Sequence, residues 1–230
     1  MADLGTADAA APFDALGLDY EKAYGHLPEQ LAALEWLAGR LPVGARVLDI
    51  GSGTGRPVAQ RLVDAGFEVT GIDVSATMVD LARQQVPGAR FELQDVRSFD
   101  APQGALDAVC AFFPLLQMPR ADLDATLERI FGWLAPGGYF VMCTVPGDLV
   151  DLEMVWLGQP IRVTSYTAEQ YRRRLDTYGF EVLHHATTVF VPNSELGEDE
   201  EHLFCYARRP GDLSGRSWST AIGRTASSPR

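Results

Sequence analysis

The stretch VLDIGSGTG, residues 47–55, decides the fold of this chain. Its apolar first half is typical of a short buried strand, and three glycines at alternate positions follow directly. Glycine permits a positive φ and lets a ligand approach the backbone closely. A helix that begins after this turn offers free N–H groups and a partial positive charge to the ligand. The stretch therefore predicts a strand, a ligand-binding turn and a helix.

The rest of the chain continues this alternation, which is typical of a parallel sheet with helices on both faces. The final two strands are joined by a loop too short for a crossover, so the seventh strand is expected to be antiparallel. The predicted fold class is α/β, a doubly wound, seven-stranded, mostly parallel sheet. The expected strands are 46–50, 67–72, 90–94, 106–112, 139–145, 180–190 and 201–208, and the expected helices are 28–41, 57–65, 76–85, 121–134 and 167–178.

The chain divides into three parts on this pattern. Residues 1–43 are expected to form an N-terminal lid and the first long helix. Residues 44–210 are expected to form the core, in which residues 146–166 are an insertion that covers the acceptor. Residues 211–230 are rich in Ser, Gly and Arg, and a disordered tail is expected there.

Composition excludes several classes of function. The net charge of −12 argues against a nucleic-acid partner, which needs a basic surface. No apolar run reaches about 18 residues, so no membrane span is expected, and the acidic start MADLGTADAA does not resemble a secretory signal. The separated Cys110, Cys143 and Cys205 lie in apolar runs, as buried thiols of a reducing compartment do. We expect a cytoplasmic monomer or homodimer with no metal site.

Three acids, Asp49, Asp73 and Asp95, lie at the ends of three consecutive predicted strands. A dinucleotide site requires G-x-G-x-x-G, but Arg56 occupies the third glycine's place. Asp49 would repel a phosphate and suit an ammonium group. Asp73 can accept both hydroxyls of a ribose, and Asp95 can accept an adenine amino group. The acids therefore favour a nucleoside that carries an amino acid.

Five segments resemble the ordered motifs of class I S-adenosylmethionine-dependent methyltransferases across residues 44–145: VLDIGSGTG, GIDVSATMVDLAR, FELQDV, LDAVCAF and LAPGGYFV. The segment AFFPLLQMPR is similar to that of bacterial small-molecule methyltransferases. The resemblance implies the sheet order 3-2-1-4-5-7-6, counted along the chain, and S-adenosyl-L-methionine as cofactor. The implied cofactor contacts are Tyr24, Asp49, Gly51, Ser52, Gly53, Gly55, Asp73, Val74, Met78, Asp95, Val96 and Phe112.

The expected acceptor is a small molecule, such as a natural-product metabolite, methylated on oxygen, nitrogen or an electron-rich aromatic carbon such as that of indole. Its pocket is expected where three segments cover the free half of the sheet edge: the N-terminal lid, residues 146–166 and the loop before the last strand. If the acceptor must lose a proton, the candidate bases are Glu201, then His26, then Tyr24. The expected acceptor contacts are Tyr20, Phe113, Trp156, Tyr166 and Glu200.

Two other functions remain open at this point. One is a nicotinamide-dependent oxidoreductase, which Asp49 and the displaced glycine disfavour. The other is a nucleoside-binding module without catalysis, which the aromatic residues of the predicted lid and insertion disfavour.

Overall fold

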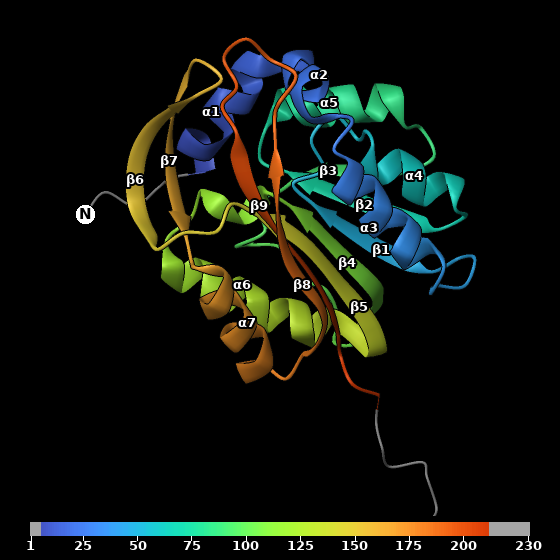
Figure 1. Cartoon of the computed structure of the whole chain (residues 1–230). Coiled ribbons are helices and arrows are strands. Elements are labelled where there is room, and N and C mark those ends of the chain that lie inside the picture. Colours follow the sequence, from blue (N-terminus) through green and yellow to red (C-terminus); the bar gives the residue numbers. More distant parts are fainter. Residues whose placement is uncertain (1–5, 212–230) are drawn as a thin grey trace, which may run out of the picture.

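The computed structural model describes residues 6–211, with side chains from residue 9 onward (Figure 1). The predicted tail lies outside the described residues except for its first residue. The helices are α1 (Thr6–Leu16), α2 (Leu18–Tyr24), α3 (Pro28–Ala38), α4 (Val58–Asp64), α5 (Ala76–Gln85), α6 (Arg120–Trp133) and α7 (Ala168–Thr177), and a single 3-10 turn spans Pro114–Leu116. The strands are β1 (Arg46–Ile50), β2 (Glu68–Asp73), β3 (Arg90–Leu93), β4 (Leu106–Phe112), β5 (Leu134–Thr144), β6 (Leu149–Trp156), β7 (Gln159–Ser165), β8 (Glu181–Phe190) and β9 (Glu200–Arg208).

Seven of the strands form one sheet in the order β3-β2-β1-β4-β5-β9-β8. The first five strands are parallel, whereas β9 runs antiparallel to both β5 and β8. This confirms the predicted fold class and strand order, because β8 and β9 are the sixth and seventh strands of the prediction. None of the helices within residues 6–211 has the length and apolarity needed to cross a membrane.

Helices cover both faces of this sheet because successive strand residues point to opposite sides. Val47 packs on one face with apolar residues of α3, α4 and α5. Its neighbour Leu48 packs on the other face with residues of α6 and α7. Cys110, Cys143 and Cys205 are buried free thiols in these two layers, as predicted.

Residues 146–166, which the sequence predicted as an insertion without strands, contain two strands. They form an antiparallel hairpin of β6 and β7 that stands beside α1, apart from the main sheet (Figure 1). Leu157 and Gly158 make the turn with φ of 46° and 75°, as a two-residue hairpin turn requires. Leucine is an unusual residue at a positive φ, which is why the turn gave no signal in the sequence.

The N-terminal helices α1 and α2 are fixed to the core by polar contacts. Asp14 accepts hydrogen bonds from the Ser75 hydroxyl and the Thr77 N–H, so α1 lies at the start of α5. Glu21 accepts a hydrogen bond of 2.6 Å from the Thr54 hydroxyl, so α2 lies on the glycine turn. Both helices therefore cover the carboxyl ends of the parallel strands.

Candidate active site

Asp73, the last residue of β2, holds the glycine turn in place. Its carboxylate accepts hydrogen bonds from the backbone N–H of Gly53 at 2.8 Å and of Ser75 at 2.9 Å. Burial raises the pKa of Asp73, and hydrogen bonds from backbone amides oppose that rise only in part. The same carboxylate lines a large cavity, so it both positions the turn and faces a ligand.

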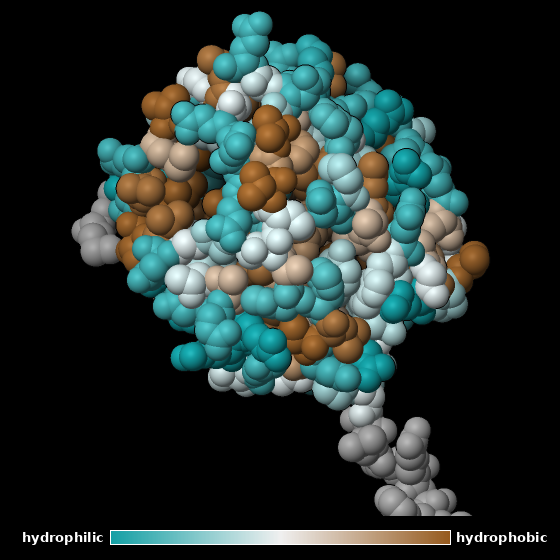
Figure 2. Space-filling view, in the orientation of Figure 1, coloured by the Kyte–Doolittle hydropathy of each residue, from teal (hydrophilic) through white to brown (hydrophobic). Residues whose placement is uncertain are grey.

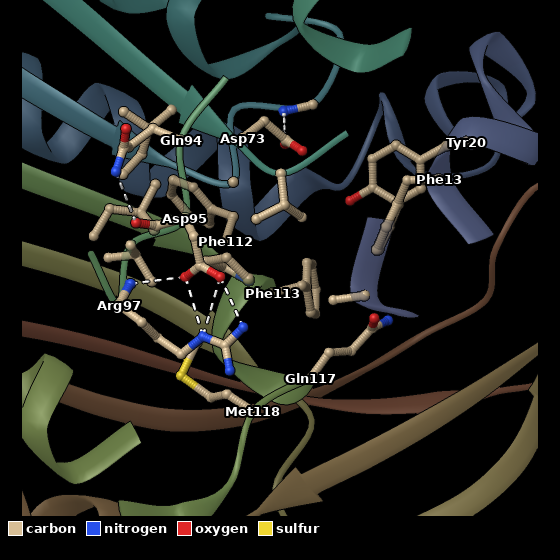
Figure 3. Close-up of a pocket in the computed structure, with 18 residues that line it drawn as sticks. Phe13, Tyr20, Asp73, Gln94, Asp95, Arg97, Phe112, Phe113, Gln117 and Met118 are labelled. Carbon is tan, nitrogen blue, oxygen red and sulfur yellow. Dashed lines mark hydrogen bonds and ion pairs between the residues drawn. The ribbon is translucent and has the colours of Figure 1, made fainter. Parts of the chain in front are cut away.

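This cavity lies at the carboxyl ends of the parallel strands and encloses about 760 Å³, including its opening to solvent. In Figure 3 Asp73 and Asp95 approach it from the sheet, and Phe13 and Tyr20 approach it from α1 and α2. Arg97 donates to the Asp95 carboxylate from its backbone N–H and its Nη2, each at 2.8 Å. The predicted cofactor residues that line the cavity are Gly51, Gly53, Asp73, Val74, Asp95, Val96 and Phe112.

A smaller recess under the glycine turn shares Gly51, Gly53 and Phe112 with this cavity and contains Asp49. Asp49 is 1% exposed, and its Oδ2 has no hydrogen-bond partner among the described residues. Burial, and then the charge of Asp73, raise the pKa of Asp49 well above its ordinary value. A buried unpaired carboxylate is costly, and a bound cation would relieve that cost.

Other polar residues also line the recess. The Ser52 hydroxyl is buried without a hydrogen-bond partner among the described residues. Gln30 of α3 and Arg56, which follows the glycine turn, line the same recess. The recess therefore combines a carboxylate with a guanidinium, the pair that an amino-acid zwitterion requires.

Two of the predicted cofactor residues lie elsewhere. Gly55 has a φ of 82°, and a Cβ there would lie 3.0 Å from Val86 and 3.2 Å from Phe91. It therefore permits close packing of the turn on α5 and β3, and it does not line the cavity. Met78 is fully buried in α5, where its N–H donates to the N-cap hydroxyl of Ser75. Neither residue lines the cavity or the recess, and packing explains the place of both.

A second cavity, of about 740 Å³ with its opening, lies beneath the hairpin. It meets the first cavity at four residues that line both, namely Phe13, Tyr20, Phe113 and Gln117. Phe113 has a φ of 70°, an uncommon value outside glycine, and its N–H donates to the Cys143 carbonyl at 2.8 Å. Backbone strain of this kind concentrates at functional sites. The remaining lining residues are Tyr24, Leu116, Val145, Leu149, Met154, Trp156, Ile161, Val163 and Glu200.

Glu200 is the centre of a hydrogen-bonded cluster at the wall of the second cavity. Its Oε1 accepts hydrogen bonds from the Tyr24 hydroxyl and, at 3.1 Å, from the Trp156 indole N–H. Its Oε2 lies 2.8 Å from Nε2 of His202, which is fully buried. Burial works against ionisation of Glu200, but these hydrogen bonds outweigh it and lower its pKa.

The structure separates the three candidate bases from one another. Glu201 is exposed and does not line the second cavity, because consecutive strand residues point to opposite faces. His26 is exposed and lines a shallow surface hollow over α4. Tyr24 lines both the second cavity and the recess that contains Asp49, but burial and then the charge of Glu200 raise its pKa, which keeps the phenol protonated. The carboxylate that lines the second cavity is that of Glu200, the residue before the first candidate base.

Tyr166 also lies away from both cavities, although Tyr20, Phe113, Trp156 and Glu200 line the second one as predicted. Its ring is 2% exposed, and its hydroxyl donates to Asp124 at 3.0 Å. The Arg174 guanidinium stacks 3.3 Å from the centre of the ring. Tyr166 therefore connects α7 to α6 and lines neither cavity.

Several residues of the site were missed in the sequence. His202 shares a face of β9 with Glu200 because the two are two positions apart, and that spacing was a usable signal. Phe13 and the apolar hairpin residues carried no signal of their own, since their place depends on contacts with distant segments.

Comparison with known proteins identifies the family. Residues 21–185 match the family model described as a methyltransferase domain. The chain is 39% identical over 101 residues to trans-aconitate 2-methyltransferase of Variovorax paradoxus, covering 43% of this chain and 38% of that protein. It is 28% identical over 227 residues to malonyl-(acyl-carrier protein) O-methyltransferase of Yersinia pestis, covering 94% of this chain and 80% of that protein.

A solved structure of the same fold is the Burkholderia thailandensis 1,6-didemethyltoxoflavin-N1-methyltransferase with bound 1,6-didemethyltoxoflavin and S-adenosylhomocysteine. Its TM-score is 0.67 at 20% identity, with 89% of this chain and 88% of that chain covered. The chain spans between 28% and 49% of the length of three of the curated relatives that it matches. The match over residues 21–185 places this chain in the class I S-adenosylmethionine-dependent methyltransferase family.

Proposed function

We propose that this protein transfers a methyl group from S-adenosylmethionine to a small molecule that binds under the hairpin. The observation that carries the proposal is the junction of the two cavities at Tyr20 and Phe113. One cavity offers the polar groups that a nucleoside with an amino acid requires, and the other is apolar with one carboxylate. Methyl transfer needs such a junction, because donor and acceptor must meet in line.

The residues of the first cavity and its recess fit S-adenosylmethionine. Asp49, whose Oδ2 is unpaired, would receive the ammonium group, and Arg56 would receive the carboxylate. Asp73 would accept the ribose hydroxyls, as its equivalent position at a strand end does in other nucleoside sites. Asp95 and Val96 would contact the adenine, although Arg97 already donates a hydrogen bond to the Asp95 carboxylate.

When bound, the cofactor supplies an activated methyl group on a sulfonium, so the protein has little covalent chemistry to perform. Tyr20 and Phe113 orient the acceptor at the junction and exclude water from it. Glu200 accepts the proton that the acceptor loses, and Tyr24, Trp156 and His202 hold its carboxylate in place. The trans-aconitate and toxoflavin-precursor methyltransferases support a small-molecule acceptor.

The test is thermal unfolding with S-adenosylhomocysteine, with NAD as the comparison. We expect a rise in Tm with S-adenosylhomocysteine only, because a ligand that binds the folded state stabilises it. Asp49→Asn should lose most of this rise while its circular dichroism spectrum is retained. A rise with NAD and none with S-adenosylhomocysteine would refute the proposal.

A further inference from the structure

The residues that line the second cavity narrow the chemical class of the acceptor further than membership of the family does. Among the described residues that line it, Glu200 is the one that carries a formal charge, and lysine, arginine and histidine are missing from that lining. The rest of the wall is aliphatic or aromatic apart from the Gln117 amide. The body of the acceptor must therefore be largely apolar.

Two of the hydrogen-bond donors in the wall are already in use. The Tyr24 hydroxyl and the Trp156 N–H both donate to Glu200 and are not available to an anion. The Gln117 amide and the Tyr20 hydroxyl remain at the junction, and both are neutral. A carboxylate in this cavity would therefore lack the cationic partner that a buried anion needs.

Glu200 itself discriminates between acceptors. Its side chain is 17% exposed, and three donors occupy three of the roughly four lone-pair positions of its carboxylate. Because these donors lower its pKa, Glu200 stays anionic and repels a second negative charge. The remaining lone pair can accept a hydrogen bond from an O–H or N–H group.

Aromatic rings reinforce this preference. The ring of Tyr20 lies 6.1 Å from that of Trp156 and 5.3 Å from that of Tyr24, and Phe13 lies 5.9 Å from Trp156. The negative faces of such rings attract cations and tolerate neutral rings. The net charge of −12 acts in the same direction at longer range.

We infer that the acceptor is a largely apolar molecule without negative charge that presents an O–H or N–H group to Glu200, and that carboxylates are excluded. This inference rests on the proposed function and separates the chain from relatives named for trans-aconitate. In the transfer the O–H or N–H bond breaks and its proton passes to Glu200. The electron pair left on oxygen or nitrogen forms the bond to the methyl carbon, and the electrons of the C–S bond return to sulfur.

The test is calorimetry of the protein saturated with S-adenosylhomocysteine, using 2-naphthol and 2-naphthoate as probes at about pH 7.5, where a carboxyl group is ionised. The two probes share one ring system and differ in the charge of one group. We expect 2-naphthol to bind at least about tenfold more tightly than 2-naphthoate, a difference of about 1.4 kcal/mol. Equal or tighter binding of 2-naphthoate, or no saturable binding of either probe, would overturn the inference.

Two variants locate the cause of the preference. Glu200→Gln should weaken 2-naphthol and strengthen 2-naphthoate, each by several-fold or more, whereas Glu201→Gln should change neither. The second substitution removes the same charge one residue along β9 on its exposed face, so it controls for the long-range field. If both variants changed the two probe affinities equally, the preference for 2-naphthol would come from the net charge, and the role of Glu200 would be overturned.

A third variant tests the inference without depending on the folding of Glu200→Gln. Met154 is 43% exposed on β6 and lines the cavity, so Met154→Arg should fold and should strengthen 2-naphthoate binding. Unchanged naphthoate affinity in that variant would contradict the location of the acceptor. Failure of the proposed function is a different outcome, in which S-adenosylhomocysteine does not bind. The affinities for the two probes can then still be compared on the protein without S-adenosylhomocysteine.

Discussion

Asp49 is a buried carboxylate in one half of the site and Glu200 is a partly buried carboxylate in the other, and their surroundings are opposite. Asp49 has an unpaired oxygen and a raised pKa, whereas Glu200 has three hydrogen-bond donors and a lowered pKa. The Asp49 carboxylate lacks a partner for one oxygen among the described residues until a cation binds, whereas hydrogen bonds already hold the Glu200 carboxylate as an anion. This difference supports the proposal that the cofactor half receives a positive charge and that the acceptor half presents an ionised carboxylate to the acceptor.

The largest effect that this comparison predicts is on turnover. Glu200→Gln removes the proton acceptor while the side chain keeps its shape, so single-turnover methyl transfer to an O–H or N–H acceptor should fall by about 100- to 10,000-fold. Glu201→Gln is the matched control and should keep its rate, since its side chain is exposed. If Glu200→Gln retains the wild-type rate with saturating cofactor, the acceptor half contains no base at this position.

A smaller effect is expected from Tyr24→Phe, which keeps the ring and removes the hydroxyl that donates to Glu200. A hydrogen bond to a charged group contributes about 1.5–3 kcal/mol, so we expect a lower Tm and a turnover reduced about tenfold. The affinity for S-adenosylhomocysteine should not change, because this hydroxyl is bonded to Glu200. Tyr24 also lines the recess that contains Asp49. A weakened cofactor affinity in calorimetry would therefore assign its hydroxyl to the cofactor half, where the sequence predicted this residue.

The smallest effect is on stability as a function of pH, and its sign differs between the two carboxylates. The pKa of Glu200 is lowered on folding, so its stabilisation is present above an unfolded pKa of about 4.3 and is lost as the pH falls through the folded value. The Tm deficit of Glu200→Gln relative to wild type should therefore shrink in acid.

The pKa of Asp49 is raised, so its penalty sets in as the pH rises above an unfolded value of about 3.9. The Tm advantage of Asp49→Asn in the unliganded protein should therefore grow with pH. Thermal unfolding of both variants and wild type across this range measures both trends. If the Tm differences of both variants from wild type changed in the same direction with pH, the environments of the two carboxylates would not differ as described.

The two halves also differ in how far the sequence predicted them. The cofactor half depends on local order, namely a strand, a glycine turn and acids at neighbouring strand ends. The structure brings the predicted Asp49, Gly51 and Asp73 together around this turn. Gly55 and Met78, which the sequence also predicted as cofactor contacts, line neither the cavity nor the recess, because glycine and methionine also serve packing.

The acceptor half depends on contacts between distant segments. Tyr24 and Glu200 are 176 positions apart, and Tyr24 and Trp156 are 132 apart. The sequence predicted which segments would meet, but the choice between Glu200 and Glu201 required the register of β9 against β8. One residue of register decides which acid faces the cavity and which faces solvent.

The most direct test of the central claim is calorimetric titration of S-adenosylhomocysteine into wild type, Asp49→Asn and Glu200→Gln. The account predicts that Asp49→Asn weakens binding by about 10- to 100-fold, the scale of a lost hydrogen bond between charged groups, and that Glu200→Gln binds as wild type does. Equal affinity in Asp49→Asn and wild type, or an equal loss in both variants, would contradict the division of the site into a cofactor half and an acceptor half.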